Sequence, residues 1–207
     1  MRAVLLAVVI LAAGLATLAW VYGGTSEPEP AAPAAASVPD RAVASPGGDR
    51  WAFLRRPLQA PPPADSGACP SAAPAMAGGQ PSFAGKGPVY TSAGTTGVVS
   101  YTKRPGEFET WGVQKFAFAI DPAYRGEVLL RGHQRYSHAP IGFGDGAAPA
   151  FERGLGLEAE AWAEGFAPGV RLYVTYIRFA EPGCYLLQAD GTDFSQVIVL
   201  DVHEGSE

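Results

Sequence analysis

The sequence predicts an all-β protein: an immunoglobulin-like β-sandwich of about seven to eight strands, preceded by an N-terminal transmembrane or signal helix and a disordered linker. Short runs of β-branched and aromatic residues recur from residue 88 onward, and Gly or Pro signals separate them about every eight to twelve residues. No run after residue 22 has a convincing helical period. The 26 glycines and 19 prolines among 207 residues suit a fold with many turns.

The first 22 residues contain the longest apolar run of the chain. Residues 3–22 carry no charge, and a helix of this length spans about 30 Å, the thickness of a bilayer core. Arg2 precedes the run and the next basic residue is Arg41, so we expect the N-terminus in the cytoplasm and the remainder exported. Residues 1–22 fit either an uncleaved membrane anchor or a cleaved signal peptide.

Residues 23–66 form a Pro/Ala-rich linker. Their composition offers too little apolar surface to offset the entropy cost of ordering, so we expect a disordered tether before a folded domain at 67–207. Within the linker, the sequence WAFLRR at residues 51–56 is more apolar than a tether requires. This stretch is either a segment that lies on the domain or the membrane surface, or a docking peptide for a partner.

The chain has two cysteines, Cys69 and Cys184. In an exported chain, two cysteines most simply form one disulfide, which here pins the end of the linker to the last hairpin. The alternative is a reactive or metal-binding thiol. The disulfide and the apolar N-terminus together predict a protein that is tethered to the outer face of the cytoplasmic membrane or secreted.

The expected strands follow from alternating or continuous apolar runs between turn signals. They cover residues 88–93, 97–102, 111–120, 127–136, 170–180, 184–189 and 194–202. An Asp190-Gly191 pair joins the last two strands, and we expect it to supply the positive φ angles of a tight hairpin turn. Residues 151–166 are ambiguous, because part of this stretch alternates like a strand and part has a helical composition.

Several motifs occur together in the domain. They are Trp111-Gly112-Val113-Gln114-Lys115, Tyr124-Arg125-Gly126, Val128-Leu129, Arg131-Gly132-His133-Gln134, and the closing run of Pro182-Gly183-Cys184-Tyr185, Gln188, Asp190-Gly191, Phe194-Ser195 and Ile198-Val199. This set resembles a group of uncharacterised bacterial exported proteins with a signal or lipoprotein segment, a Cys-Pro near the domain start and a closing GCY…Q.DG..FS..IV hairpin. Cys69-Pro70 matches the Cys-Pro position, whereas a lipobox cysteine is lacking. The resemblance implies an exported β-sandwich and transfers no catalytic residue.

The strand expected at 127–136 carries the most informative polar pattern. Alternation places Arg131, His133 and Arg135 on one face. Two forked guanidinium donors beside a titratable ring are suited to a carboxylate or phosphate, so these three residues are the candidate ligand-binding site. The alternative is a solvent-facing sheet surface that pairs with acidic residues on a neighbouring strand.

Other chemistries find little support in the residue pattern. His133 and His138 do not have a recognised metal-ligand spacing, and no Gly-x-Ser-x-Gly motif marks a nucleophile. We therefore expect no metal, no cofactor and no catalytic residue. The net charge of −5 argues against nucleic acid as a partner.

The sequence thus favours a non-catalytic cell-envelope module for protein interaction or structural support. The second function is an anion-binding protein that uses Arg131, His133 and Arg135, and an enzyme ranks third. The expected partners are an envelope protein or an anionic ligand, with the membrane contacted through the N-terminal segment. An exposed aromatic patch that includes Trp111 or Trp162 would mark the interaction module. The pattern leaves the oligomeric state open.

Overall fold

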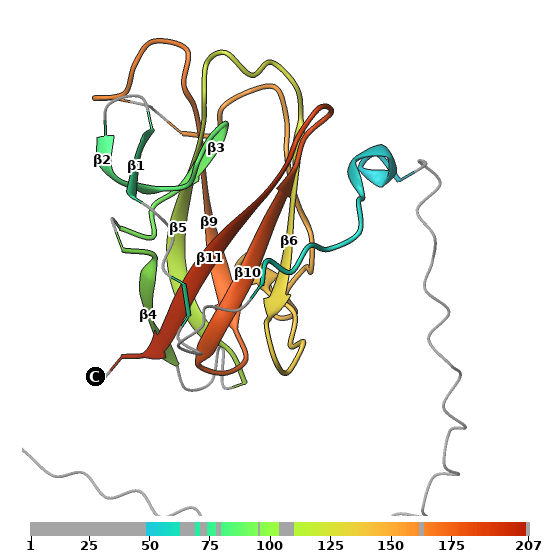
Figure 1. The fold of residues 1–207 in the computed structure, drawn as a ribbon, viewed down its shortest axis with the longest axis vertical. Helices are drawn as coiled ribbons and strands as arrows, with labels where there is room; N and C mark the ends of the chain where they lie inside the picture. The colour runs from blue at the N-terminus through green and yellow to red at the C-terminus, as the bar shows by residue number, and fades with distance from the viewer. Residues whose placement is uncertain are drawn as a thin grey trace, which may run out of the picture. The chain divides into compact units, whose positions relative to one another are not determined.

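The computed structural model describes residues 49–62, 69–70, 74–77, 80–94, 96–103, 110–161 and 164–205 (Figure 1). This part of the chain confirms the predicted all-β, sandwich-like fold: its only helix is a short 3-10 turn, η1, at Ala52–Leu54. Among the residues described, no helix is long and apolar enough to cross a membrane. The helix expected at 1–22 and the linker up to residue 48 lie outside the described residues.

Eleven strands are found in the described residues. They are β1 (Pro74–Ala77), β2 (Gln80–Ala84), β3 (Val89–Thr91), β4 (Val98–Lys103), β5 (Gly112–Ile120), β6 (Val128–Gln134), β7 (Gly142–Phe143), β8 (Arg153–Leu155), β9 (Arg171–Phe179), β10 (Gly183–Asp190) and β11 (Ser195–Glu204). The seven predicted strands correspond to β3, β4, β5, β6, β9, β10 and β11. The short strands β1, β2 and β7 were not predicted, because Gly, Pro and Ala obscure any alternation there.

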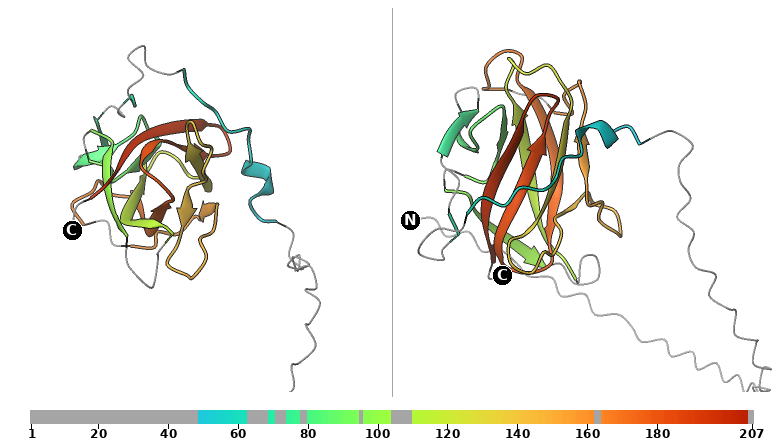
Figure 2. Two further views of the ribbon diagram at one scale, coloured as in Figure 1. Left: turned by 90° about the horizontal axis from the view of Figure 1, so that it is seen from below. Right: turned by 45° about the vertical axis from the view of Figure 1, so that its right-hand side comes forward.

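The strands form two layers that curve around the core when seen from below (Figure 2). One layer contains β11, β10, β6 and β8 in antiparallel pairs, and the other centres on β5 and β9, which pair from Gly112↔Phe179 to Ile120↔Arg171. Strand β4 joins the layers, because it pairs in parallel with β11 from Val98 and antiparallel with β5 at Thr102. Strand β4 therefore connects the two layers through backbone hydrogen bonds at one side of the sandwich, over the length of β4.

Alternation along the long strands sends one face of each into a shared core. That core is built from large apolar side chains of both layers, and its fully buried members include Tyr101, Phe116, Phe118, Leu130, Tyr173, Ile177, Phe179, Tyr185, Leu187 and Leu200. The Phe179 ring meets the Tyr185 ring edge-on, with centroids 4.9 Å apart, so an aromatic contact links the two layers. The opposite, outer face of β6 and β10 contacts residues 49–62.

The ambiguous stretch 151–166 contributes β8 followed by turns, and the described residues of this stretch contain no helix. Backbone N–H groups of Glu160 and Ala161 donate to the Leu172 carbonyl at 2.9 and 3.1 Å. These bonds hold the segment against β9. The helical composition of this stretch is thus overridden by tertiary contacts.

The Asp190-Gly191 turn was predicted wrongly. Strand β10 continues through Asp190, which pairs with Ser195, and neither Asp190 nor Gly191 has a positive φ. The turn spans 191–194 and is closed by the Gly191 N–H donating to the Phe194 carbonyl at 3.0 Å. Glycine is required at 191 for space, since a Cβ there would lie 2.1 Å from the Phe194 ring and 2.5 Å from the Tyr124 hydroxyl.

The predicted disulfide is confirmed: Cys69 is bonded to Cys184, with 5.3 Å between the two Cα atoms. It crosslinks residues 115 positions apart and joins the chain before β1 to the second residue of β10. A crosslink of this kind is typical of proteins that fold in an oxidising compartment.

We expect Cys184→Ala to lower the free energy of unfolding by about 4–5 kcal/mol, because opening a loop of this size restores the conformational entropy of the unfolded chain. Cys69→Ala should cost a similar amount, and the double variant should cost little more than either one, since all three lack the same bond. Chemical denaturation of the four proteins measures this. Additive losses would show that the cysteines stabilise the fold independently.

Candidate functional site

Residues 49–62, called the strap from here on, lie across the outer face of β6 and β10 (Figures 1 and 2). The sequence had placed them in the linker, and of the two interpretations of WAFLRR the structure supports the segment that lies on the domain. Leu54 in the 3-10 turn is fully buried. The Trp51 ring packs so closely on Gly154 of β8 that a Cβ at Gly154 would lie 2.0 Å from it. These two apolar side chains anchor the start of the strap.

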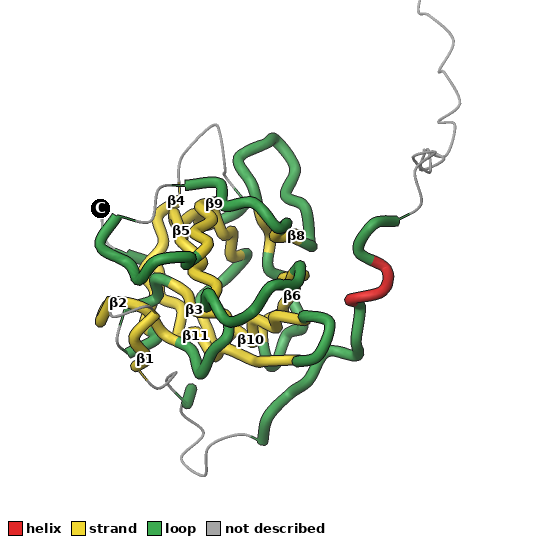
Figure 3. Tube along the Cα trace, turned by 90° about the horizontal axis from the view of Figure 1, so that it is seen from above, coloured by secondary structure: helices red, strands yellow, loops and turns green. Residues whose placement is uncertain are grey.

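Seen from above, η1 lies beyond β6 and the strap continues on the outer side of β10 (Figure 3). Pro57, Pro61 and Pro62 lack a backbone N–H, and this part of the strap does not pair with the sheet as a regular strand. Its carbonyl groups still require hydrogen-bond donors where the strap is buried against the sheet. Long polar side chains of β6 and β10 supply those donors.

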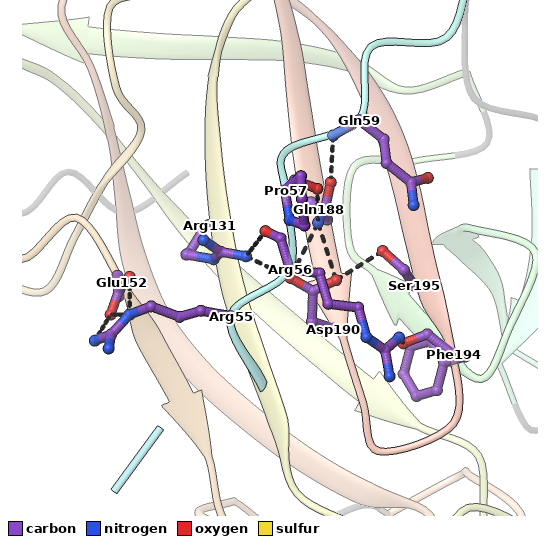
Figure 4. Close-up of polar contacts among 10 residues, drawn as sticks. All are labelled: Arg55, Arg56, Pro57, Gln59, Arg131, Glu152, Gln188, Asp190, Phe194 and Ser195. Atoms are coloured by element: carbon purple, nitrogen blue, oxygen red, sulfur yellow. Dashed lines mark hydrogen bonds and ion pairs between the residues drawn. The ribbon is translucent and has the colours of Figure 1, made fainter. Parts of the chain in front are cut away.

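Side chains of β6 and β10 form four hydrogen bonds with the strap, and Figure 4 draws those of Arg131 and Gln188. Arg131 of β6 donates to the Arg56 carbonyl at 2.6 Å, and Arg135 donates to the carbonyl of Pro61. Gln188 of β10 bonds the strap twice: its amide nitrogen donates to the Pro57 carbonyl at 3.1 Å, and its oxygen accepts the Gln59 N–H at 2.7 Å. Side chains thus replace the missing backbone ladder.

The strap also contributes its own arginines. Arg55 forms a forked ion pair with Glu152, with contacts of 2.6 to 3.1 Å (Figure 4). Arg56 donates to the carbonyls of Thr192, at 2.8 Å, and Phe194. Glu152 and then Asp49 raise the pKa of Arg55. Both carboxylates are solvent-accessible, so these ion pairs position the strap more than they stabilise it.

Asp190 is the centre of the polar network beneath the strap. Its side chain is fully buried and receives hydrogen bonds from Arg131 at 2.7 Å, Ser195 at 2.6 Å and Gln188 at 2.9 and 3.0 Å. These donors come from β6, β11 and β10 respectively. The Arg131 side chain is only 14% exposed, so this ion pair is largely shielded from water. A charge buried in this way is tolerated only because it is paired and hydrogen-bonded.

The three predicted ligand-binding residues therefore point toward different groups of the chain itself. Arg131 contacts Asp190 and the strap, and Arg135 contacts the strap at Pro61. The His133 ring lies beside the His138 ring, with centroids 5.5 Å apart. Their predicted role in binding an anion remains a prediction, and the contacts that the structure does provide are internal ones.

His133 is distinguished by its surroundings. Burial, and then the charge of His138, lower the pKa of His133 below its ordinary value of 6.5. Its Nδ1 atom is buried and has no hydrogen-bond partner among the described residues. The described residues also contain no group of three or more His, Cys, Asp or Glu side chains placed to hold a metal ion.

The residue type of Gln188 suited a hydrogen-bonding partner of backbone groups, but its contact with the strap was not expected, and Asp190 was expected in the turn. A signal in the sequence was that Arg131, Gln188 and Asp190 are polar residues within largely apolar strands. In the structure, Gln188 pairs with Arg131, and Asp190 pairs with Leu129 two residues away. Polar side chains opposite each other in otherwise apolar strands indicate a shared partner. The partner itself, a segment about 130 positions earlier in the chain, has no local signature.

Comparison with protein-family models, curated proteins and solved structures found no match. A function for this chain is therefore inferred from its own residues.

We expect Arg131→Ala to lower the free energy of unfolding by about 3–5 kcal/mol, because it leaves the buried Asp190 carboxylate without its counter-charge. Arg135→Ala is the matched control. It removes a hydrogen bond to a strap carbonyl but strands no charge, so its cost should be about 1–2 kcal/mol. Denaturant titration of both variants distinguishes the two effects, and equal losses would contradict the central role of the ion pair.

The lowered pKa of His133 predicts a pH-dependent stability. The unfolded chain binds a proton at His133 more readily than the folded one, so stability should fall as the pH decreases through about 6.5 and level off below the folded-state pKa. Thermal unfolding between pH 8 and pH 5 measures this slope. His133→Gln should flatten it, whereas His203→Gln, at an exposed site, should leave the His133 contribution in place.

Proposed function

We propose that this protein is an exported, non-catalytic module of immunoglobulin-like type that acts at the outer face of the cytoplasmic membrane through protein interaction or structural support. The disulfide and the apolar run at 3–22 support export. The strap supports a positioning role, because it attaches the N-terminal part of the chain firmly to the domain near residue 50 rather than at residue 66. The domain is then held by a shorter tether.

The observation that carries the choice of function is the coverage of the basic face. Arg131 and Arg135, the forked donors that suit an anion, are both bonded to the strap, and Arg131 also has a carboxylate partner. An anion would have to displace these half-buried contacts, and each hydrogen bond that is lost costs about 0.5–1.5 kcal/mol. Interaction with a protein has no such cost.

An exposed aromatic pair supports interaction with a protein. Phe151 is 51% exposed and its ring contacts the Trp111 ring, with centroids 6.2 Å apart. Aromatic side chains that are only partly covered are enriched in protein interfaces. Trp111 was one of the two tryptophans expected in such a patch. The other, Trp162, lies outside the described residues.

We expect a photo-crosslinking amino acid at Phe151 to capture a protein partner in intact cells, because this ring is available for contact next to Trp111. The matched control is the same probe at Arg125, an exposed turn position between β5 and β6. A specific band at Phe151 and none at Arg125 is the expected result. Crosslinking at neither position would count against this face as an interface.

The anion-binding alternative is tested by thermal unfolding of the full chain with phosphate and with dicarboxylates. We expect no shift in the melting temperature, whereas a ligand present at a hundred times its dissociation constant would add about 2.7 kcal/mol. A shift of several degrees that Arg135→Ala removes would make anion binding the better function. Arg135 is the better test position because its loss leaves the Asp190 ion pair intact.

A further inference from the structure

A groove of about 790 Å³ lies alongside the first half of β11. It is lined by Ser195–Val199 of β11, the end of the strap at Gln59–Pro62, Pro70 beside the disulfide, and the turn at Gly85–Gly87 between β2 and β3. Val197 and Val199 on the outer face of β11 are only partly buried. The groove is therefore a largely apolar channel that follows a strand, and its volume falls within the range of binding sites.

Within the described residues, the first part of β11, residues 195–200, has no strand partner on the side that faces away from β10. β11 pairs with β10 along Ser195–Val202, but with β4 only from Asp201 onward. In the described part of the chain, no strand pairs with residues 195–200 on that side. A strand edge of this kind is a template for another extended chain.

The direction of the free backbone groups follows from two hydrogen bonds. The Asp201 N–H donates to the Gly97 carbonyl at 2.9 Å, on the side away from β10, whereas the Phe194 carbonyl accepts the Gly191 N–H in the hairpin turn. Backbone groups alternate in direction along a strand, so those of Val197 and Val199 face the same side as those of Asp201. Their N–H and C=O groups are thus directed to the free edge of β11 at the groove.

Two polar groups at the groove also lack partners. Gln196 is 9% exposed, its amide nitrogen donates to the Val89 carbonyl at 2.8 Å, and its Oε1 is buried without a hydrogen-bond partner among the described residues. Lys86 on the opposite wall is exposed and forms no ion pair with a described residue. The Gln196 side chain lies on the face of β11 opposite to Val197 and Val199, toward β3, so Lys86 is the group placed to attract a partner, and its ammonium group favours a carboxylate.

We propose that an extended segment of a partner protein binds in this groove and adds a strand to the free edge of β11. Its backbone would bond the N–H and C=O groups of Val197 and Val199, alternate apolar side chains would cover these valines, and an acidic residue would lie beside Lys86. This inference rests on the proposed interaction function and deepens it by naming the class of partner. The proposed peptide site lies at β11 and Lys86, whereas the crosslinking experiment probes the separate surface around Phe151 and Trp111.

The test uses the full-length, disulfide-bonded chain and a displayed library of linear ten-residue peptides. We expect selected peptides to alternate apolar side chains, to contain Asp or Glu, and to protect the amides of Val197 and Val199 from hydrogen exchange on binding. Peptides that bind without protecting these two amides, or a library that yields no binder, would overturn the proposal. Crosslinking at Phe151 is independent of this result, so the two proposals fail separately.

Val197→Pro removes one N–H from the free edge without removing a bond to β10, because the Val197 N–H faces away from that strand. We expect it to weaken peptide binding about tenfold or more, which corresponds to the loss of roughly one main-chain hydrogen bond. Val197→Thr keeps the N–H and the β-branched shape, so it should bind the peptide almost as well as the unaltered chain.

A second pair of variants tests the proposal even if the proline variant fails to fold. Lys86→Glu should weaken binding of acidic peptides about tenfold by charge reversal, whereas Lys115→Glu, on β5 and not among the residues that line the groove, should leave binding unchanged. Both positions are exposed, so neither change is expected to unfold the domain. Binding that is indifferent to both Val197→Pro and Lys86→Glu would overturn the proposal.

Discussion

The buried ion pair between Arg131 and Asp190 is the interaction on which the rest of this face depends. A carboxylate with no exposure to water must have its charge compensated and its oxygens hydrogen-bonded. Here the donors come from β6, β10 and β11, and the same Arg131 side chain continues to a carbonyl of the strap. One buried charge therefore couples the alignment of three strands to the position of a segment far earlier in the chain.

The strap and the disulfide act together on the N-terminal end of the domain. The strap does not pair with the sheet as a strand and has proline at 57, 61 and 62, so its attachment relies on arginine and glutamine side chains that bond its carbonyls. The disulfide then fixes the chain covalently at Cys69, after the strap has crossed the sheet. Residues 49–62, which have the composition of a linker, thus pack against the folded domain.

The strap covers the basic side chains of β6 and leaves other parts of the surface exposed. The basic face of β6 is occupied by contacts within the chain, whereas residues 195–200 of β11 have no second strand partner in the described part of the chain and Phe151 beside Trp111 is half exposed. Both available surfaces offer what a protein partner requires, namely unpaired backbone groups and partly covered aromatic rings. A sandwich that is closed by β4 over only part of its length retains such an edge beside an otherwise complete core.

The amino-acid sequence by itself determined the long strands and the crosslink. Alternation of apolar residues over 111–120, 127–136 and 194–202 predicts strands because each buries one face, and two cysteines in an exported chain allow one intramolecular pairing. Only the tertiary structure decided the role of Asp190, the docking of residues 49–62 and the free edge of β11. Each of these depends on a contact, or on the lack of one, between residues far apart in the chain, such as Gln59 and Gln188, and local sequence patterns carry no information about such distant partners.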